Sequence, residues 1–154
     1  KRIIIMNFLI QTDPLGYLVI ALILGSVLGL ERTLARKDAG VRTYGLVSMG
    51  ACLFVTLAQF IGPVADTSSP GQLYVLQGLI MGIGFIGGGA ILHGREHNHE
   101  HASGLTTAAG LWIAAGIGAA VGYGLVKLAV FTTLTTLIVF TLFWFIEHKL
   151  VDRK

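Results

Sequence analysis

The sequence predicts an all-α fold, a polytopic membrane protein that forms a compact bundle of about five transmembrane helices. Hydrophobic residues make up 54% of the 154 residues and charged residues only 12%, which is too apolar for an ordinary soluble domain. The apolar residues are gathered in long uncharged segments that are rich in glycine and alanine. The single cysteine, Cys52, excludes an intrachain disulfide framework and a cysteine metal site.

Five segments lack Asp, Glu, Lys and Arg and have roughly the 17 to 25 residues that are needed to cross a bilayer. They are residues 14–30, 45–62, 73–92, 105–125 and 128–146. The last two are nearly continuous, and we expect the chain to reverse at Gly122–Lys127, where two glycines free the backbone. The spans then form one transmembrane domain, 14–146, between an extracytoplasmic segment, 1–13, and a short cytoplasmic tail, 147–154.

The positive charges predict the orientation of this domain. Eight of the 11 Lys and Arg residues fall in the links after the first and third spans and in the tail after the fifth span. The positive-inside rule makes these segments cytoplasmic and places the N-terminus outside. Lys1 and Arg2 are exceptions; Met6 could be the natural initiator, which would make residues 1–5 an upstream extension.

Small residues recur at four-residue spacing in three of the spans. The pairs are Gly25 and Gly29, Gly78 and Gly82, and Gly118 and Gly122. Because no hydrophobic effect drives helices together in lipid, small side chains that let backbones approach are typical of packing faces. We expect packing within the bundle or between copies, with a homodimer as the simplest closed assembly. A pore or a ligand site is the alternative.

The third span carries further glycines, which lower its helix propensity. They are Gly84, Gly87, Gly88 and Gly89. We expect this helix to bend or break at Gly87–Gly89, which would expose carbonyl groups where protein or water can bind them.

Several blocks of residues occur in an order and spacing that resemble a known family. They are Glu31-Arg32, Ala39-Gly40-Val41-Arg42-Thr43, Gly82-Ile83-Gly84-Phe85-Ile86-Gly87-Gly88-Gly89, Gly104-Leu105-Thr106-Thr107-Ala108-Ala109 and Gly116-Ile117-Gly118. Over about residues 16–125 the chain closely resembles the MgtC/SapB family of bacterial inner-membrane proteins. The resemblance implies about five spans and a link to adaptation to low magnesium, to stress and, in pathogens, to virulence. Many relatives carry a C-terminal cytoplasmic domain, and we expect this sequence to be a short form without it.

Polar residues of these blocks gather at the predicted cytoplasmic edge and form a candidate functional cluster. Its members are Glu31, Arg32, Arg42, Thr43, Thr106 and Thr107. We expect Glu31 to pair with Arg42 and clamp the first two helices, or the cluster to contact lipid headgroups. The alternative is a cytoplasm-facing site for a small ion or a partner helix. Ser103 or Thr106 is expected to cap the fourth helix.

The link after the third span is rich in histidine. It contains His93, His97, His99 and His101, together with Glu96 and Glu100. The imidazoles at positions 97, 99 and 101 could bind Zn, Ni or Cu, whereas magnesium prefers oxygen ligands. A solvated polar loop is the simpler interpretation. We expect no cofactor, with magnesium or a transition metal as the alternative.

The spans contain no His, Asp, Glu or Lys, so they lack an intramembrane protease base and a pair of haem ligands. We therefore expect no enzymatic activity. The cations form clusters between apolar segments and not a basic face, so no nucleic-acid partner is expected. We expect a regulator or scaffold that docks against another inner-membrane protein through its small-residue faces. The alternative is a divalent-cation (magnesium) transporter or channel.

Overall fold

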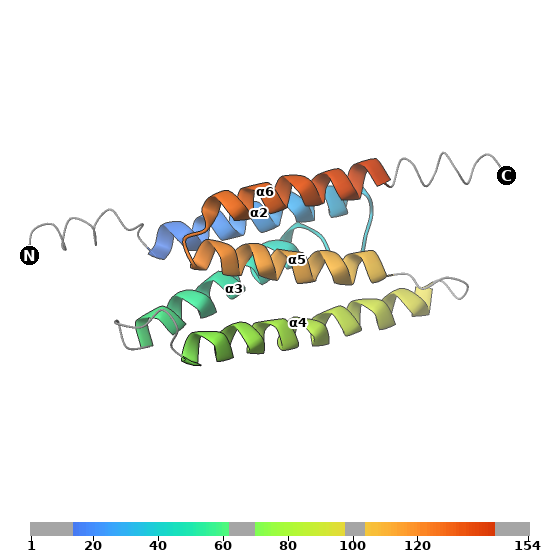
Figure 1. Cartoon of the computed structure of the whole chain (residues 1–154). Helices are drawn as coiled ribbons and strands as arrows, with labels where there is room; N and C mark the ends of the chain where they lie inside the picture. The colour runs from blue at the N-terminus through green and yellow to red at the C-terminus, as the bar shows by residue number, and fades with distance from the viewer. Residues whose placement is uncertain (1–13, 62–69, 98–103, 144–154) are drawn as a thin grey trace, which may run out of the picture.

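The computed structural model describes residues 14–61, 70–97 and 104–143, which form helices and the short links between them. The helices are α2 (Pro14–Leu34), α3 (Val41–Ile61), α4 (Pro70–His97), α5 (Leu105–Gly122) and α6 (Val126–Ile138), and α6 continues as a π-helical turn, η1 (Val139–Phe143). They lie side by side in one bundle (Figure 1). The described residues contain no strand, and the prediction of an all-α polytopic bundle is confirmed.

The helices α2 to α5 are each long and apolar enough to cross a membrane. Within the described residues α6 and η1 form a shorter apolar helix, Val126–Leu142. The end of the fifth predicted span, residues 144–146, lies outside the described residues. The chain is thus a multi-pass helical membrane protein.

The centre of the bundle is α5, which packs against α2, α3, α4 and α6 (Figure 1). Residues buried inside the bundle make up 56% of its span, compared with 11% of the span of α4. The reversal between α5 and α6 falls where it was predicted. Gly124 has a φ of +76°, in the left-handed region that residues with a side chain rarely adopt.

Two glycines of α5 let it approach α3 closely. A Cβ atom at Gly118 would overlap the carbonyl group of Ser48, and one at Gly122 would come within 2.9 Å of the carbonyl oxygen of Cys52. A Cβ atom at Gly25 of α2 would lie 2.5 Å from the carbonyl oxygen of Tyr44 in α3. The three helices therefore meet backbone to backbone.

The helix α4 runs without interruption through its glycines, so the prediction of a break at Gly87–Gly89 is wrong. Gly87 packs against Ala108 of α5, while the Cβ positions of Gly88 and Gly89 face open space. Each glycine costs a helix about 1 kcal/mol relative to alanine. A backbone group left without a partner in hydrocarbon costs several kcal/mol, so the continuous helix is the more stable arrangement.

We predict that Gly118→Ala destabilises the bundle by about 1–3 kcal/mol, because overpacking at a backbone contact forces α5 away from α3. The matched control is Gly116→Ala, two residues away on the same helix, where a Cβ atom meets nothing within 4 Å. Thermal unfolding of the protein in lipid nanodiscs measures both changes. Equal midpoints for the two variants would contradict the proposed role of the close contact.

Candidate functional site

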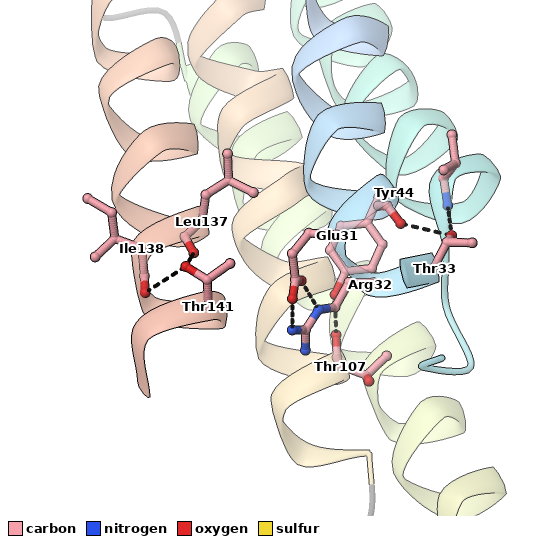
Figure 2. Close-up of polar contacts among 10 residues, drawn as sticks. Glu31, Arg32, Thr33, Tyr44, Thr107, Leu137, Ile138 and Thr141 are labelled. Carbon is pink, nitrogen blue, oxygen red and sulfur yellow. Dashed lines mark hydrogen bonds and ion pairs between the residues drawn. The ribbon is translucent and has the colours of Figure 1, made fainter. Parts of the chain in front are cut away.

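A partly buried ion pair forms in the last turns of α2. The guanidinium group of Arg32 donates from Nε to Oε2 of Glu31 at 2.5 Å and from Nη2 to Oε1 at 2.8 Å (Figure 2). The side chain of Arg32 is 3% exposed and that of Glu31 is 17% exposed. Two charges in this position are stabilised by each other, and the arginine also lies near the C-terminal end of the helix dipole, which favours a cation.

The other side of the guanidinium group is covered by an aromatic ring. The carbon Cζ of Arg32 lies 3.9 Å from the ring centre of Phe140 in η1, and this ring is itself buried. Such a cation–π contact contributes up to about 2 kcal/mol when it is shielded from water. The ion pair is therefore held between α2 and the π-helical turn that follows α6.

The start of α5 closes this site. The hydroxyl group of Tyr44 in α3 donates to the carbonyl oxygen of Thr107 at 3.3 Å (Figure 2). Gly110 of α5 leaves room for two rings, because a Cβ atom there would meet the Tyr44 hydroxyl and would lie 2.7 Å from Phe140. Side chains from α2, α3 and η1 thus converge on the backbone of α5 at one end of the bundle.

The link between α2 and α3 is fixed by Thr33 and by the way that α2 ends. The hydroxyl group of Thr33 accepts from the backbone N–H of Val41 at 3.2 Å and donates to the carbonyl oxygen of Gly29 at 3.0 Å (Figure 2). Arg36 takes a left-handed φ of +53°, and the N–H groups of Arg36 and Lys37 bind the carbonyls of Thr33 and Arg32. This Schellman-type ending turns the chain directly into α3.

The structure brings only part of the predicted cluster together. Glu31, Arg32 and the buried Thr107 lie at the site, whereas the side chains of Arg42, Thr43 and Thr106 are exposed. The expected ion pair of Glu31 with Arg42 is wrong, because the carboxylate binds Arg32.

Two residues of the site were missed in the sequence. Tyr44 stands next to the matched Arg42-Thr43, and its position at the start of a span was the signal for it. Phe140 carried no comparable signal, since it is one of several aromatic residues more than 100 positions after Arg32.

The cap of α5 also differs from the expectation. Gly104 is the N-cap residue, with a φ of +98° and no side-chain hydrogen bond, and Thr106 does not cap the helix. A Cβ atom at Gly104 would lie 2.5 Å from the carbonyl oxygen of Ala90, so the cap is also where α5 meets α4. Ser103 lies outside the described residues.

The predicted glycine faces fall into two groups. Gly118 and Gly122 face α3 at close range, as described above. The Cβ positions of the α4 glycines are open, with nothing within 4 Å, at Gly78, Gly82, Gly84, Gly88 and Gly89. An apolar groove of about 680 Å³ runs between α3 and α4, and Gly50, Ala51, Gly78 and Gly82 are among its lining residues.

The candidate metal ligands are mostly beyond the described residues. His97 is the last residue of α4, and His99 and His101 lie in the segment 98–103, which the structure does not describe. Within the described ranges no three His, Cys, Asp or Glu side chains are grouped so that they could hold a metal ion.

We predict that Arg32→Met destabilises the protein by about 1–3 kcal/mol, the usual effect of leaving a polar group without its partner, because the partly buried Glu31 carboxylate loses its counter-charge. The double variant Glu31→Gln/Arg32→Met is expected to lose less than Arg32→Met alone. Arg42→Met, at an exposed position, is the control. Thermal unfolding in nanodiscs gives the comparison, and additive losses for Glu31→Gln and Arg32→Met would show that the two groups do not interact.

Comparison with known proteins identifies the family. Residues 18–149 match the model of the MgtC family. The chain is 38% identical to protein SrpB of Synechococcus elongatus over 139 residues, which cover 85% of this chain and 76% of SrpB. It is 32% identical over 142 residues to YhiD of Escherichia coli, whose name describes it as a candidate magnesium transporter; the match covers 89% of this chain and 63% of YhiD.

A match to an uncharacterised protein of Haemophilus influenzae is 38% identical over 95 residues and covers 59% of this chain and 39% of that protein. The chain therefore spans between about two fifths and three quarters of the length of these relatives. No solved structure matches the chain significantly. Because the family model covers most of its length, the chain belongs to the MgtC family.

Proposed function

We propose that this protein is a non-enzymatic regulator or scaffold of the bacterial inner membrane that acts by docking against another membrane protein. We assign it a part in adaptation to low magnesium and stress, which is supported by its membership of the MgtC family and by the name of the relative YhiD, a candidate magnesium transporter. The N-terminus is outside and the C-terminus is cytoplasmic. The exposed cations Arg36 and Lys37 between α2 and α3, and Arg42 in the first turn of α3, support this orientation by the positive-inside rule.

The observation that supports docking is the apolar groove between α3 and α4. Its lining includes glycine and alanine, together with Leu46 and Phe54 of α3 and Ile86 of α4. In a bilayer, small residues on a helix face permit the close approach that van der Waals packing between helices needs. The occupant that fits is a transmembrane helix of another protein, with small residues where it crosses Gly78 and Gly82.

The ion pair at the end of α2 has a structural part in this function. It joins α2 to η1 while Tyr44 joins α3 to α5, so the wall of the groove that belongs to α3 is held in place against the central helix. The two charges are bound to each other and the guanidinium group is buried. We assign to this cluster the positioning of α2 and α3 and not the binding of a free ion.

We predict that Gly82→Leu abolishes co-purification of a stoichiometric membrane partner from native membranes in mild detergent, because the leucine fills the groove. The variant is expected to fold normally, since nothing lies within 4 Å of this position. Gly16→Leu, at an equally open position on α2, is the control and is expected to retain the partner. Recovery of the partner with Gly82→Leu would contradict docking in the groove.

A magnesium transporter or channel is the second candidate function, and the name of the relative YhiD favours it. We predict that the purified protein alone gives proteoliposomes no magnesium flux above that of empty liposomes, because dication pathways usually present oxygen ligands, and Glu31, the carboxylate within α2, is occupied by Arg32. A magnesium-sensitive dye inside the liposomes measures the flux. Robust flux that is lost in Glu31→Gln would overturn the regulator proposal.

A further inference from the structure

One polar side chain stands on the open side of α4 at the depth of the hydrocarbon. Gln77 is exposed and forms no hydrogen bond in the described part of the chain. It lies six residues after the start of the candidate span Gly71–Leu92, which at about 1.5 Å per residue is about 9 Å along the helix. A span of this length that is centred on a hydrocarbon core of about 30 Å places this amide inside the core.

An amide group in hydrocarbon needs partners. Transfer of an amide to a medium without hydrogen-bonding groups is strongly unfavourable, and glutamine side chains in membrane helices typically bind across to a neighbouring helix. The side chain of Gln77 offers both N–H donors and a carbonyl acceptor. A partner with the same two kinds of group would satisfy it fully.

The residues that share a face with Gln77 are suited to a close helix contact. In a helix, positions 77, 81, 84 and 88 follow one side, at steps of four, three and four residues. Met81 is 69% exposed, and the Cβ positions of Gly84 and Gly88 are open. This Gln77 face, defined as Gln77, Met81, Gly84 and Gly88, does not include the residues of α4 that line the groove.

We propose that the Gln77 face is the interface of a symmetric homodimer. All copies insert into the membrane with the same orientation, so Gln77 of one copy lies at the same depth as Gln77 of the next. Across a two-fold axis each amide donates to the other and accepts from it, and the two glycines let the α4 helices approach. A second copy of this chain is thus the occupant whose polar group is complementary in both chemistry and depth. The inference goes beyond the proposed function, because it leaves the groove free and holds whether or not a partner docks there.

The test is disulfide cross-linking of the purified full chain in liposomes, in a Cys52→Ala background. Met81→Cys is expected to give a cross-linked dimer under mild oxidation. Ile23→Cys is the control, because this side chain is also exposed and lies at a similar depth. It is nine residues after the start of α2, and Met81 is ten residues after the start of the α4 span. The control is expected to give no dimer, so equal cross-linking at both positions would overturn the proposal.

Two further variants separate the interface from the fold. Gln77→Leu and Gly84→Leu change exposed positions and are expected not to lower the helix content or the unfolding midpoint. Each is expected to weaken dimerisation by about threefold to tenfold, as measured by energy transfer between labelled copies while lipid dilutes the protein. Dimerisation unchanged in both variants would overturn the Gln77 face as the interface, and this result would leave the partner pull-down with Gly82→Leu unaffected.

Discussion

The bundle depends on the close approach of α5 to α3, which is possible because Gly118 carries no side chain. In lipid the hydrophobic effect does not press these helices together, so their backbone contact has to provide the packing. Hydrogen bonds tie the same two helices on both sides of this contact: Tyr44 binds the carbonyl of Thr107 at one end, and Gln59 donates to the carbonyl of Gly122 at 2.7 Å at the other. The second bond also satisfies a carbonyl that the end of a helix leaves free.

The packing of α3 against α5 also positions the charged C-terminal end of α2, where Glu31 and Arg32 lie. A guanidinium group at this edge of the membrane would be costly to bury alone. Here it is bound by the neighbouring carboxylate and covered by Phe140, so α2 continues through Glu31 and Arg32 as a helix. The cations that follow, among them Arg36 and Arg42, stay exposed to water or headgroups. Cations close together in sequence thus have separate roles, one in packing and the others at the surface.

Features set by local chemistry were predictable from the sequence, and those set by distant contacts were not. Hydropathy found the positions of the helices, and two glycines marked the turn before α6. The pairing of Glu31 with Arg32 depended on where side chains point after folding. The predicted first span, 14–30, ended before α2 does, because the first charged residue was taken as the end of the helix. The contact with Phe140 joins residues more than 100 positions apart, which no local pattern encodes. The continuity of α4 was missed because the low propensity of glycine was weighed without the larger cost of free backbone groups in lipid.

The open glycines of α4 differ in kind from Gly118 of α5. At Gly118 a side chain is sterically excluded by the fold of the single chain, but at Gly82 or Gly84 the same fold would accept one. Alanine there would strengthen the helix by about 1 kcal/mol per position, so within one chain these glycines only weaken α4. Their physical advantage is close approach by a helix from outside. Gly82 lines the groove and Gly84 lies on the Gln77 face, two different sides of one helix, so the proposed dimer leaves the groove free for the proposed partner.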